Sequence, residues 1–73
     1  MQKACLSDNC YNITKQLSKK LEFLSHVNKY IEDALKSNDK DAETIWNTIR
    51  IDEEKHADML HKLLLSEAKH NRL

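Results

Sequence analysis

Residues 31–46, IEDALKSNDKDAETIW, decide the fold, because they contain the only turn-like segment of the chain. The segment 36–39, KSND, interrupts an apolar pattern that runs up to it and resumes beyond it. One of the polar residues 37–39 is expected to cap the helix that follows. Acidic Asp41 and Glu43 are favourable in the first turn of that helix. The sequence therefore predicts a turn at residues 37–40 between two helices.

Both flanking segments carry apolar residues at helical spacing. The segment before the turn predicts a helix over residues 12–36, because its apolar residues alternate between steps of three and four. These residues are Ile13, Leu17, Leu21, Leu24, Val27, Ile31 and Leu35. The segment after the turn predicts a second helix over residues 41–70. Its apolar face collects Ala42, Ile45, Trp46, Ile49, Ala57, Met59, Leu60, Leu63 and Leu64. Residues 1–11 lack this periodicity and are expected to form a loose N-terminal lead-in.

The predicted architecture is all-α, a single domain over residues 1–73 that folds as an antiparallel two-helix hairpin. A short connection makes the two helices antiparallel neighbours. Each apolar face spans about half of the helix circumference, whereas one partner helix covers only a narrow seam. Large apolar strips left in water normally mark an association surface. The hairpin is therefore expected to self-associate as a homo-oligomer, most simply as two hairpins forming a four-helix bundle.

The composition supports a helical chain and excludes several functional classes. The 73 residues include no Gly and no Pro, which argues for few turns and against glycine-rich phosphate loops. Twelve basic and twelve acidic residues balance, so nucleic acid is not an expected partner. No apolar run approaches the ~20 residues that span a bilayer, and no signal peptide is recognisable, so a cytoplasmic protein without membrane contact is expected. Cys5 and Cys10 are expected to be free thiols, with a local disulfide or an intermolecular link as alternatives.

The tetrapeptide Glu53-Glu54-Lys55-His56 carries the most specific chemical signal. Residues three apart share one side of a helix, so Glu53 and His56 can point at one position. A carboxylate oxygen and an imidazole nitrogen that converge there make half of a transition-metal site. The residues next to Glu53 on the same face of the helix are apolar. A charge in such an apolar stripe is costly unless it is paired or bound to a metal.

The stretch 52–60, DEEKHADML, resembles the second-helix signature of ferritin-like carboxylate proteins, most closely that of the short two-helix encapsulated ferritins. Tyr30, Asp33 and Ala34 are similar to the same family, and the likeness covers residues 20–65. The resemblance implies that two hairpins build a di-iron site at their interface, where ferrous iron is oxidised by dioxygen. Manganese and zinc are the other metals that such a ligand set accepts. A hairpin has no storage cavity of its own, so iron storage would need a protein shell or a larger assembly.

The resemblance implies that Glu53 and His56 are metal ligands and that the first helix adds a carboxylate. Glu22 is the carboxylate at the expected height of that helix, although its helical neighbours are polar. Measured back from Tyr30, the position of the family's Glu falls on Phe23, which cannot bind metal. Enzymatic activity therefore stays open, with a ferroxidase as the activity that the resemblance implies.

The alternative hypothesis is a metal-free oligomerisation or interaction module. Lys20 is expected on the apolar face of the first helix, level with Glu53, where the two charges can pair without a metal. Such an ion pair adds little stability but can fix the register and the choice of partner. A second Glu-x-x-His copy, at Glu67 and His70, is expected to be solvated surface at a frayed helix end.

Overall fold

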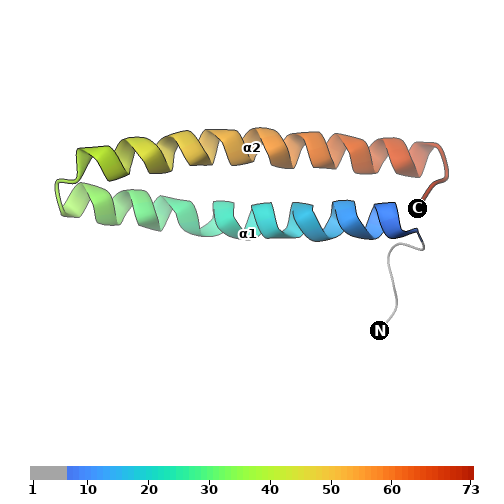
Figure 1. Ribbon diagram of the computed structural model, residues 1–73, viewed down its shortest axis with the longest axis horizontal. Helices are drawn as coiled ribbons and strands as arrows, with labels where there is room; N and C mark the ends of the chain where they lie inside the picture. Colours follow the sequence, from blue (N-terminus) through green and yellow to red (C-terminus); the bar gives the residue numbers. More distant parts are fainter. Residues whose placement is uncertain (1–6) are drawn as a thin grey trace.

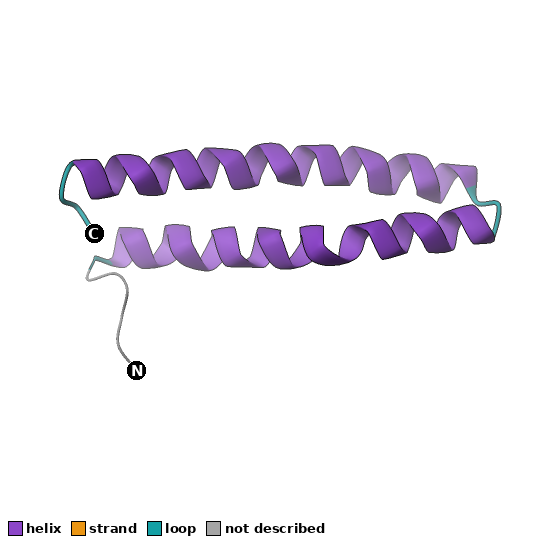
Figure 2. Ribbon diagram, turned by 180° about the vertical axis from the view of Figure 1, so that it is seen from behind, coloured by secondary structure: helices purple, strands orange, loops and turns teal. Residues whose placement is uncertain are grey.

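The computed structural model describes residues 7–73, which form two long antiparallel helices. Helix α1 spans Asp8–Lys36 and helix α2 spans Lys40–Lys69, and the two lie side by side along their whole length (Figure 1). Everything else in the described part of the chain is turn or loop (Figure 2). The prediction of an all-α helical hairpin is confirmed.

Helix α1 begins at Asp8, earlier than the predicted start at residue 12. Ser7 is the reason, because its side-chain oxygen accepts a hydrogen bond from the backbone N–H of Cys10 at 3.1 Å. Such a cap satisfies one of the four free N–H groups of the first turn, and the negative charge of Asp8 adds to the favourable start. The first turn is polar, so apolar periodicity alone does not detect it.

The turn between the helices combines a C-cap with an N-cap. Asn38 takes the left-handed conformation (φ 57°) after the end of α1. The backbone N–H of Asp39 then donates to the carbonyl of Ala34 at 2.9 Å, and that of Asn38 to the carbonyl of Leu35 at 3.2 Å. These two bonds define a Schellman motif, in which Asn here takes the place of the usual Gly. Asp39 caps α2 by accepting a hydrogen bond from the backbone N–H of Ala42 at 3.0 Å. The sequence predicted a cap among residues 37–39, and Asp39 is that cap.

The same Schellman motif ends α2. Asn71 has a φ of 57°, the N–H of Arg72 donates to the carbonyl of Glu67 at 2.7 Å, and the N–H of Asn71 donates to the carbonyl of Ala68 at 3.0 Å. The reversal folds residues 70–73 back over the last turn of α2. The hydroxyl of Ser7 donates to the carbonyl of Arg72 at 3.0 Å, which ties this reversal to the start of α1.

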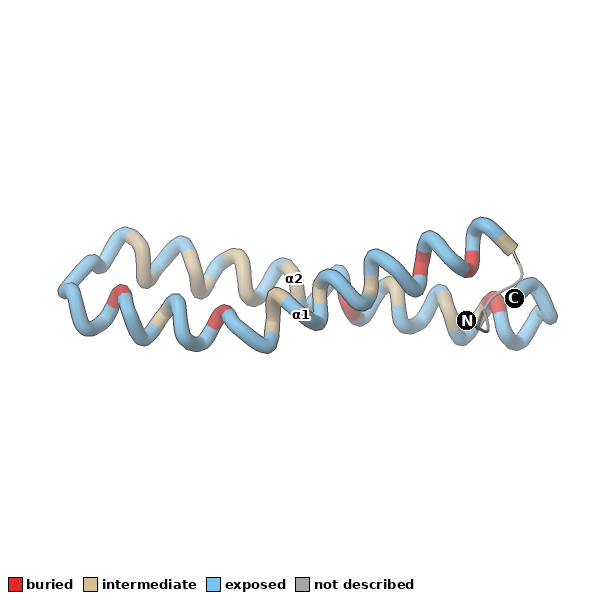
Figure 3. The backbone as a smooth tube through the Cα atoms, turned by 90° about the horizontal axis from the view of Figure 1, so that it is seen from below, coloured by how far each residue is buried: buried red, intermediate tan, exposed pale blue. Residues whose placement is uncertain are grey.

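The hairpin buries a thin seam and leaves most of its surface in water, as the few buried positions in Figure 3 show. The buried apolar residues are Cys10, Ile13, Val27, Ala34 and Ala57. The radius of gyration is 15.9 Å, whereas a compact domain of this length has one of about 11 Å. The extents of 50 × 24 × 13 Å describe a single layer of helices.

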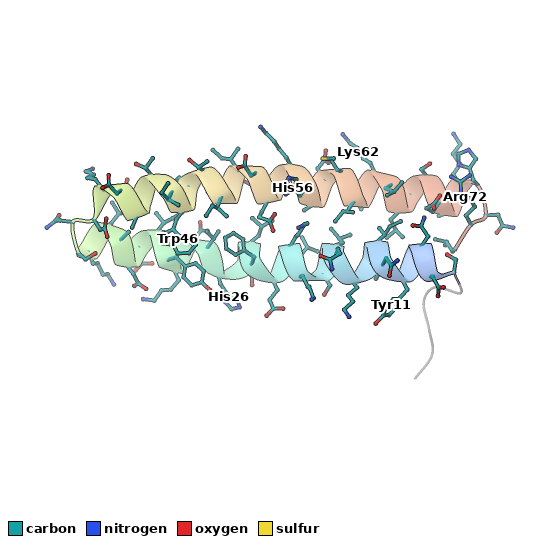
Figure 4. All side chains as sticks on the ribbon, viewed as in Figure 1. Tyr11, His26, Trp46, His56, Lys62 and Arg72 are labelled. Carbon is teal, nitrogen blue, oxygen red and sulfur yellow. The ribbon has the colours of Figure 1, made fainter. Side chains whose placement is uncertain are left out.

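Three aromatic rings strengthen the half of the seam that lies nearer the turn. The ring centroids of Tyr30 and Trp46 are 5.0 Å apart, and the ring of Phe23 lies 6.3 Å from Tyr30 and 6.4 Å from Trp46. Tilted pairs at these distances are favourable beyond the area that they bury. Trp46 accordingly points into the space between the helices, whereas Tyr11 points away from it (Figure 4).

One expectation about the cysteines is wrong. Cys10 is disulfide-bonded and fully buried, so it is not a free thiol. Cys5 lies outside the described residues. In the part of the chain that the structure describes, neither helix combines the length and the apolar character that crossing a lipid bilayer requires.

Candidate polar site at the helix seam

The middle of the hairpin holds a polar cluster of three side chains around one carboxylate oxygen. Oε1 of Glu53 lies 2.9 Å from Nδ1 of His56 and 3.4 Å from Nζ of Lys20. The contact with His56 joins two residues of α2 that are one turn apart, and the contact with Lys20 crosses the seam to α1. Lys20 and Glu53 are therefore brought together as the sequence predicted.

The cluster lies at the edge of the seam, neither buried nor fully solvated. The side chain of Lys20 is 24% exposed, that of Glu53 20% and that of His56 52%. Figure 4 shows His56 over the ribbon of α2 rather than between the helices. The hydrogen bond from His56 lowers the pKa of Glu53; partial burial opposes this shift, and the positive charge of Lys20 supports it. Glu53 is therefore held as a carboxylate by its two neighbours.

An apolar groove opens beside the cluster on one face of the hairpin. Its walls come from both helices and consist of Gln16, Lys20, His56, Met59 and Leu60. The groove therefore joins the polar cluster to exposed apolar side chains. Among the large apolar residues that the structure describes, Met59 is the most exposed, at 64%. This combination of a satisfied polar group and an open apolar wall is typical of a contact surface.

The structure does not gather the third predicted ligand with the other two. Glu22 is exposed on α1, and the neighbouring Phe23 takes the inward position in the aromatic cluster. Within residues 7–73, no three His, Cys, Asp or Glu side chains lie close enough together to hold a metal ion. One hairpin therefore offers a carboxylate and an imidazole, with an ammonium group beside them.

The second Glu-x-x-His copy differs from the prediction. Glu67 is not solvated surface: it is 5% exposed and is the only buried charged residue that the structure describes. Its carboxylate accepts from Nε of Arg72 and from Nδ2 of Asn9, both at 2.6 Å. The hydrogen bond from Arg72 is the main cause that lowers the pKa of Glu67; burial opposes it. His70 is exposed, as predicted.

Sequence reasoning missed this cluster, which we call the end clasp and define as Asn9, Glu67 and Arg72. One signal was present in the sequence. In a chain without Gly, an Asn near the end of a helix can take the left-handed conformation of a Schellman motif, and Asn71 is such a residue. The motif bonds the residue after this Asn to the residue five positions before that one. The motif therefore sets Arg72 against Glu67.

The remaining histidines lie in solvent. His26 and His61 are exposed.

Comparisons with known proteins add no relative: no protein family model matches the chain, and no characterised protein or solved structure is detectably similar to it. The ferritin-like resemblance therefore rests on the sequence alone, chiefly on the motif around Glu53.

Proposed function

We propose that this chain is a metal-free association module in which two hairpins pair to form a four-helix bundle. The observation that carries the proposal is the single layer of helices with apolar side chains on its broad surface. Stable domains bury a core between two layers, and one hairpin supplies only one. A second copy brings the missing layer with the same apolar residues, so that a two-fold pair is self-complementary.

The contact surface that we propose is the Met59 face, defined by Phe23 and Tyr30 of α1 and by Ile45, Asp52 and Met59 of α2. Residues seven apart return to within about 20° on a helix, so each set forms one stripe along its helix. The two stripes lie on the same side of the hairpin. Gln16 is seven residues before Phe23 and so extends the stripe of α1, and Gln16 lines the groove beside the polar cluster together with Met59 of α2. Ile45 and Met59 are 57% and 64% exposed, and burying them would provide the driving force.

The polar cluster gives this surface specificity rather than affinity. The Lys20–Glu53 pair is half-buried in the hairpin and would lose more water on pairing. Ion pairs in such positions contribute little net stability, but this pair fixes the register of α1 against α2 within each hairpin, because a shifted register would leave one charge without its partner. The cluster therefore fixes the alignment of the two helices that present the Met59 face.

Sedimentation equilibrium of the wild type, Met59→Asp and Leu65→Asp tests this proposal. Leu65 is a matched control, since it is 56% exposed on the same helix but points about 120° away from Met59. We expect a wild-type dimer, a dissociation constant at least about tenfold higher for Met59→Asp, and no change for Leu65→Asp. A monomeric wild type, or equal effects of the two substitutions, would overturn the proposal.

A second candidate function is iron binding between paired hairpins, which the convergence of Glu53 and His56 favours. A carboxylate and an imidazole from each copy would supply ligands of the types that iron, manganese and zinc accept. The ammonium group of Lys20, 3.4 Å from the same carboxylate oxygen, repels a metal cation and ranks this candidate second. Ferroxidase activity would depend on this binding.

Elemental analysis after ferrous iron is added under anaerobic conditions and excess metal is removed tests the second candidate. Iron that is bound in fixed proportion to the wild type and lost in both Glu53→Ala and His56→Ala would support it. His70→Ala is the matched control, because His70 belongs to the same sequence pattern but is exposed at the helix end. Wild-type protein that retains no iron would remove this candidate.

A further inference from the structure

The two ends of the hairpin carry opposite charge. The turn half, residues 21–53, contains four Lys or Arg and eight Asp or Glu, a net charge of −4. The open half, residues 7–20 and 54–73, contains seven Lys or Arg and four Asp or Glu, a net charge of +3. Because the helices are antiparallel and of nearly equal length, these sequence segments are also the two spatial halves of the molecule (Figure 1). The neutral chain is thus an elongated charge dipole.

We infer that the two copies pair head to tail, with the acidic turn half of one hairpin over the basic open half of the other. This inference rests on the proposed function, because it assigns the orientation of the pair. Two-fold pairing of the Met59 faces allows two orientations. We call the position of a residue along the long axis of the hairpin its level. In one orientation each level of a hairpin lies opposite the same level of its copy, so that the turn of one copy meets the turn of the other. In the other, turn meets open end. Facing helices are antiparallel in both, so the helix macrodipoles do not choose between them.

Charge does choose between them, since pairing of equal levels brings −4 against −4 and +3 against +3, whereas head-to-tail pairing brings opposite charges together. Electrostatic complementarity of this kind selects the orientation of an interface more than it raises affinity. The apolar stripes of the Met59 face supply the attraction in either orientation, and like charges at the same level penalise only one of them.

The middle of the Met59 face shows the same complementarity at the level of single residues. Asp52 lies about 4 Å from the midpoint of α2 toward the turn, and Lys20 lies about 3 Å from the midpoint of α1 toward the open end. Head-to-tail pairing therefore sets Asp52 at the level of Lys20 and His56 of the second copy. Pairing of equal levels sets Asp52 at the level of Asp52 and of the acidic Glu53 of the second copy.

Lysine cross-linking of an equal mixture of ¹⁴N- and ¹⁵N-labelled wild-type protein tests the orientation. Links between a light and a heavy peptide report contacts between copies. The cross-linker is chosen with a reach of less than half of the 50 Å hairpin, so no intramolecular link joins the two ends. We expect light–heavy links from Lys36 and Lys40, at the turn, to Lys62 and Lys69, near the open end. Light–heavy links that join turn lysines to turn lysines would overturn the inference.

The dissociation constant of Asp52→Lys provides an independent measurement. Head-to-tail pairing predicts a constant at least about fivefold higher, because each dimer turns two attractions into repulsions. Pairing of equal levels predicts no weakening, because the like-charged Asp52 pair becomes a like-charged Lys pair while the repulsion from Glu53 becomes an attraction. Glu54→Lys is the matched control, since Glu54 is an exposed acid at the same level whose partner is Arg50 on the other side of α2. A wild type that sediments as a monomer defeats the proposed function itself, whereas a dimer with turn-to-turn links defeats only the orientation.

Discussion

Glu53 and Glu67 begin the same Glu-x-x-His pattern on the same helix, but their surroundings differ. Glu67 is buried in the end clasp and bonded to Arg72 and Asn9 at 2.6 Å. Glu53 lies at the edge of the seam with His56 at 2.9 Å and Lys20 at 3.4 Å. The two glutamates are 14 residues apart, a spacing that keeps both on the seam side of α2. The difference comes from residues outside the pattern, so the pattern alone does not determine the role of its glutamate.

Of the substitutions at these two glutamates, Glu67→Ala is expected to have the largest effect. The substitution leaves Arg72 and Asn9 without their shared acceptor and releases the end clasp, which joins the two ends of the described chain. Buried polar groups that lose a partner are costly. We expect amide hydrogen exchange to become about tenfold faster in residues 8–13 and 66–72, with the middle of the hairpin unchanged. Glu54→Ala, which removes an exposed ion pair, is the control. Unchanged protection at both ends would show that the clasp does not hold the termini.

A smaller effect is expected for the Lys20–Glu53 pair. The two side chains remain partly exposed and their separation is long for a charged hydrogen bond. A double-mutant cycle with Lys20→Ala and Glu53→Ala, measured by urea unfolding, is expected to give a coupling energy of about 0.2–1 kcal/mol. The coupling should fall as salt is raised to 1 M, because partly exposed charges are screened. A coupling of zero at low salt would mean that the contact is incidental.

The smallest expected difference is in the response to acid, because the pKa of both glutamates is lowered in the folded chain. Between the folded and unfolded pKa values, the unfolded state binds more protons, so stability rises with pH. Each contribution is complete above the unfolded value of about 4.3 and is lost as pH falls through the lower folded value. Urea unfolding at pH 6 and at pH 3 should therefore show a loss that is smaller in Glu53→Gln and in Glu67→Gln than in the wild type. An equal loss in all three proteins would contradict the assignment.

The sequence predicted the hairpin but not all of its details, for physical reasons that differ between residues. The apolar spacing from Ile13 to Leu35 and the polar turn at residues 36–39 are local signals, and they predict the two helices and their direction. The early start of α1 depends on a single cap by Ser7, which periodicity cannot detect. The end clasp depends on a backbone reversal at Asn71, and only that reversal brings Arg72 onto Glu67.

The candidate site was predicted in part. The Lys20–Glu53 and Glu53–His56 contacts follow from helical spacing and from the level of the two helices about the turn, and both are present. Whether the site contains Glu22 or a metal stays a prediction, because it depends on a second chain and on ligands that one sequence does not specify. The inward position of Phe23 follows from its packing against Trp46 and favours the metal-free proposal.

Isotope-filtered nuclear Overhauser spectroscopy on a mixture of labelled and unlabelled protein can show whether two hairpins pair through the Met59 face. The experiment detects only contacts between copies and identifies the residues that make them. We expect intermolecular signals from the methyl groups of Ile45 and Met59 and from the ring of Tyr30, and none from Leu65. Intermolecular signals from Leu65 with none from Met59, or no intermolecular signal at any residue, would contradict pairing through this face.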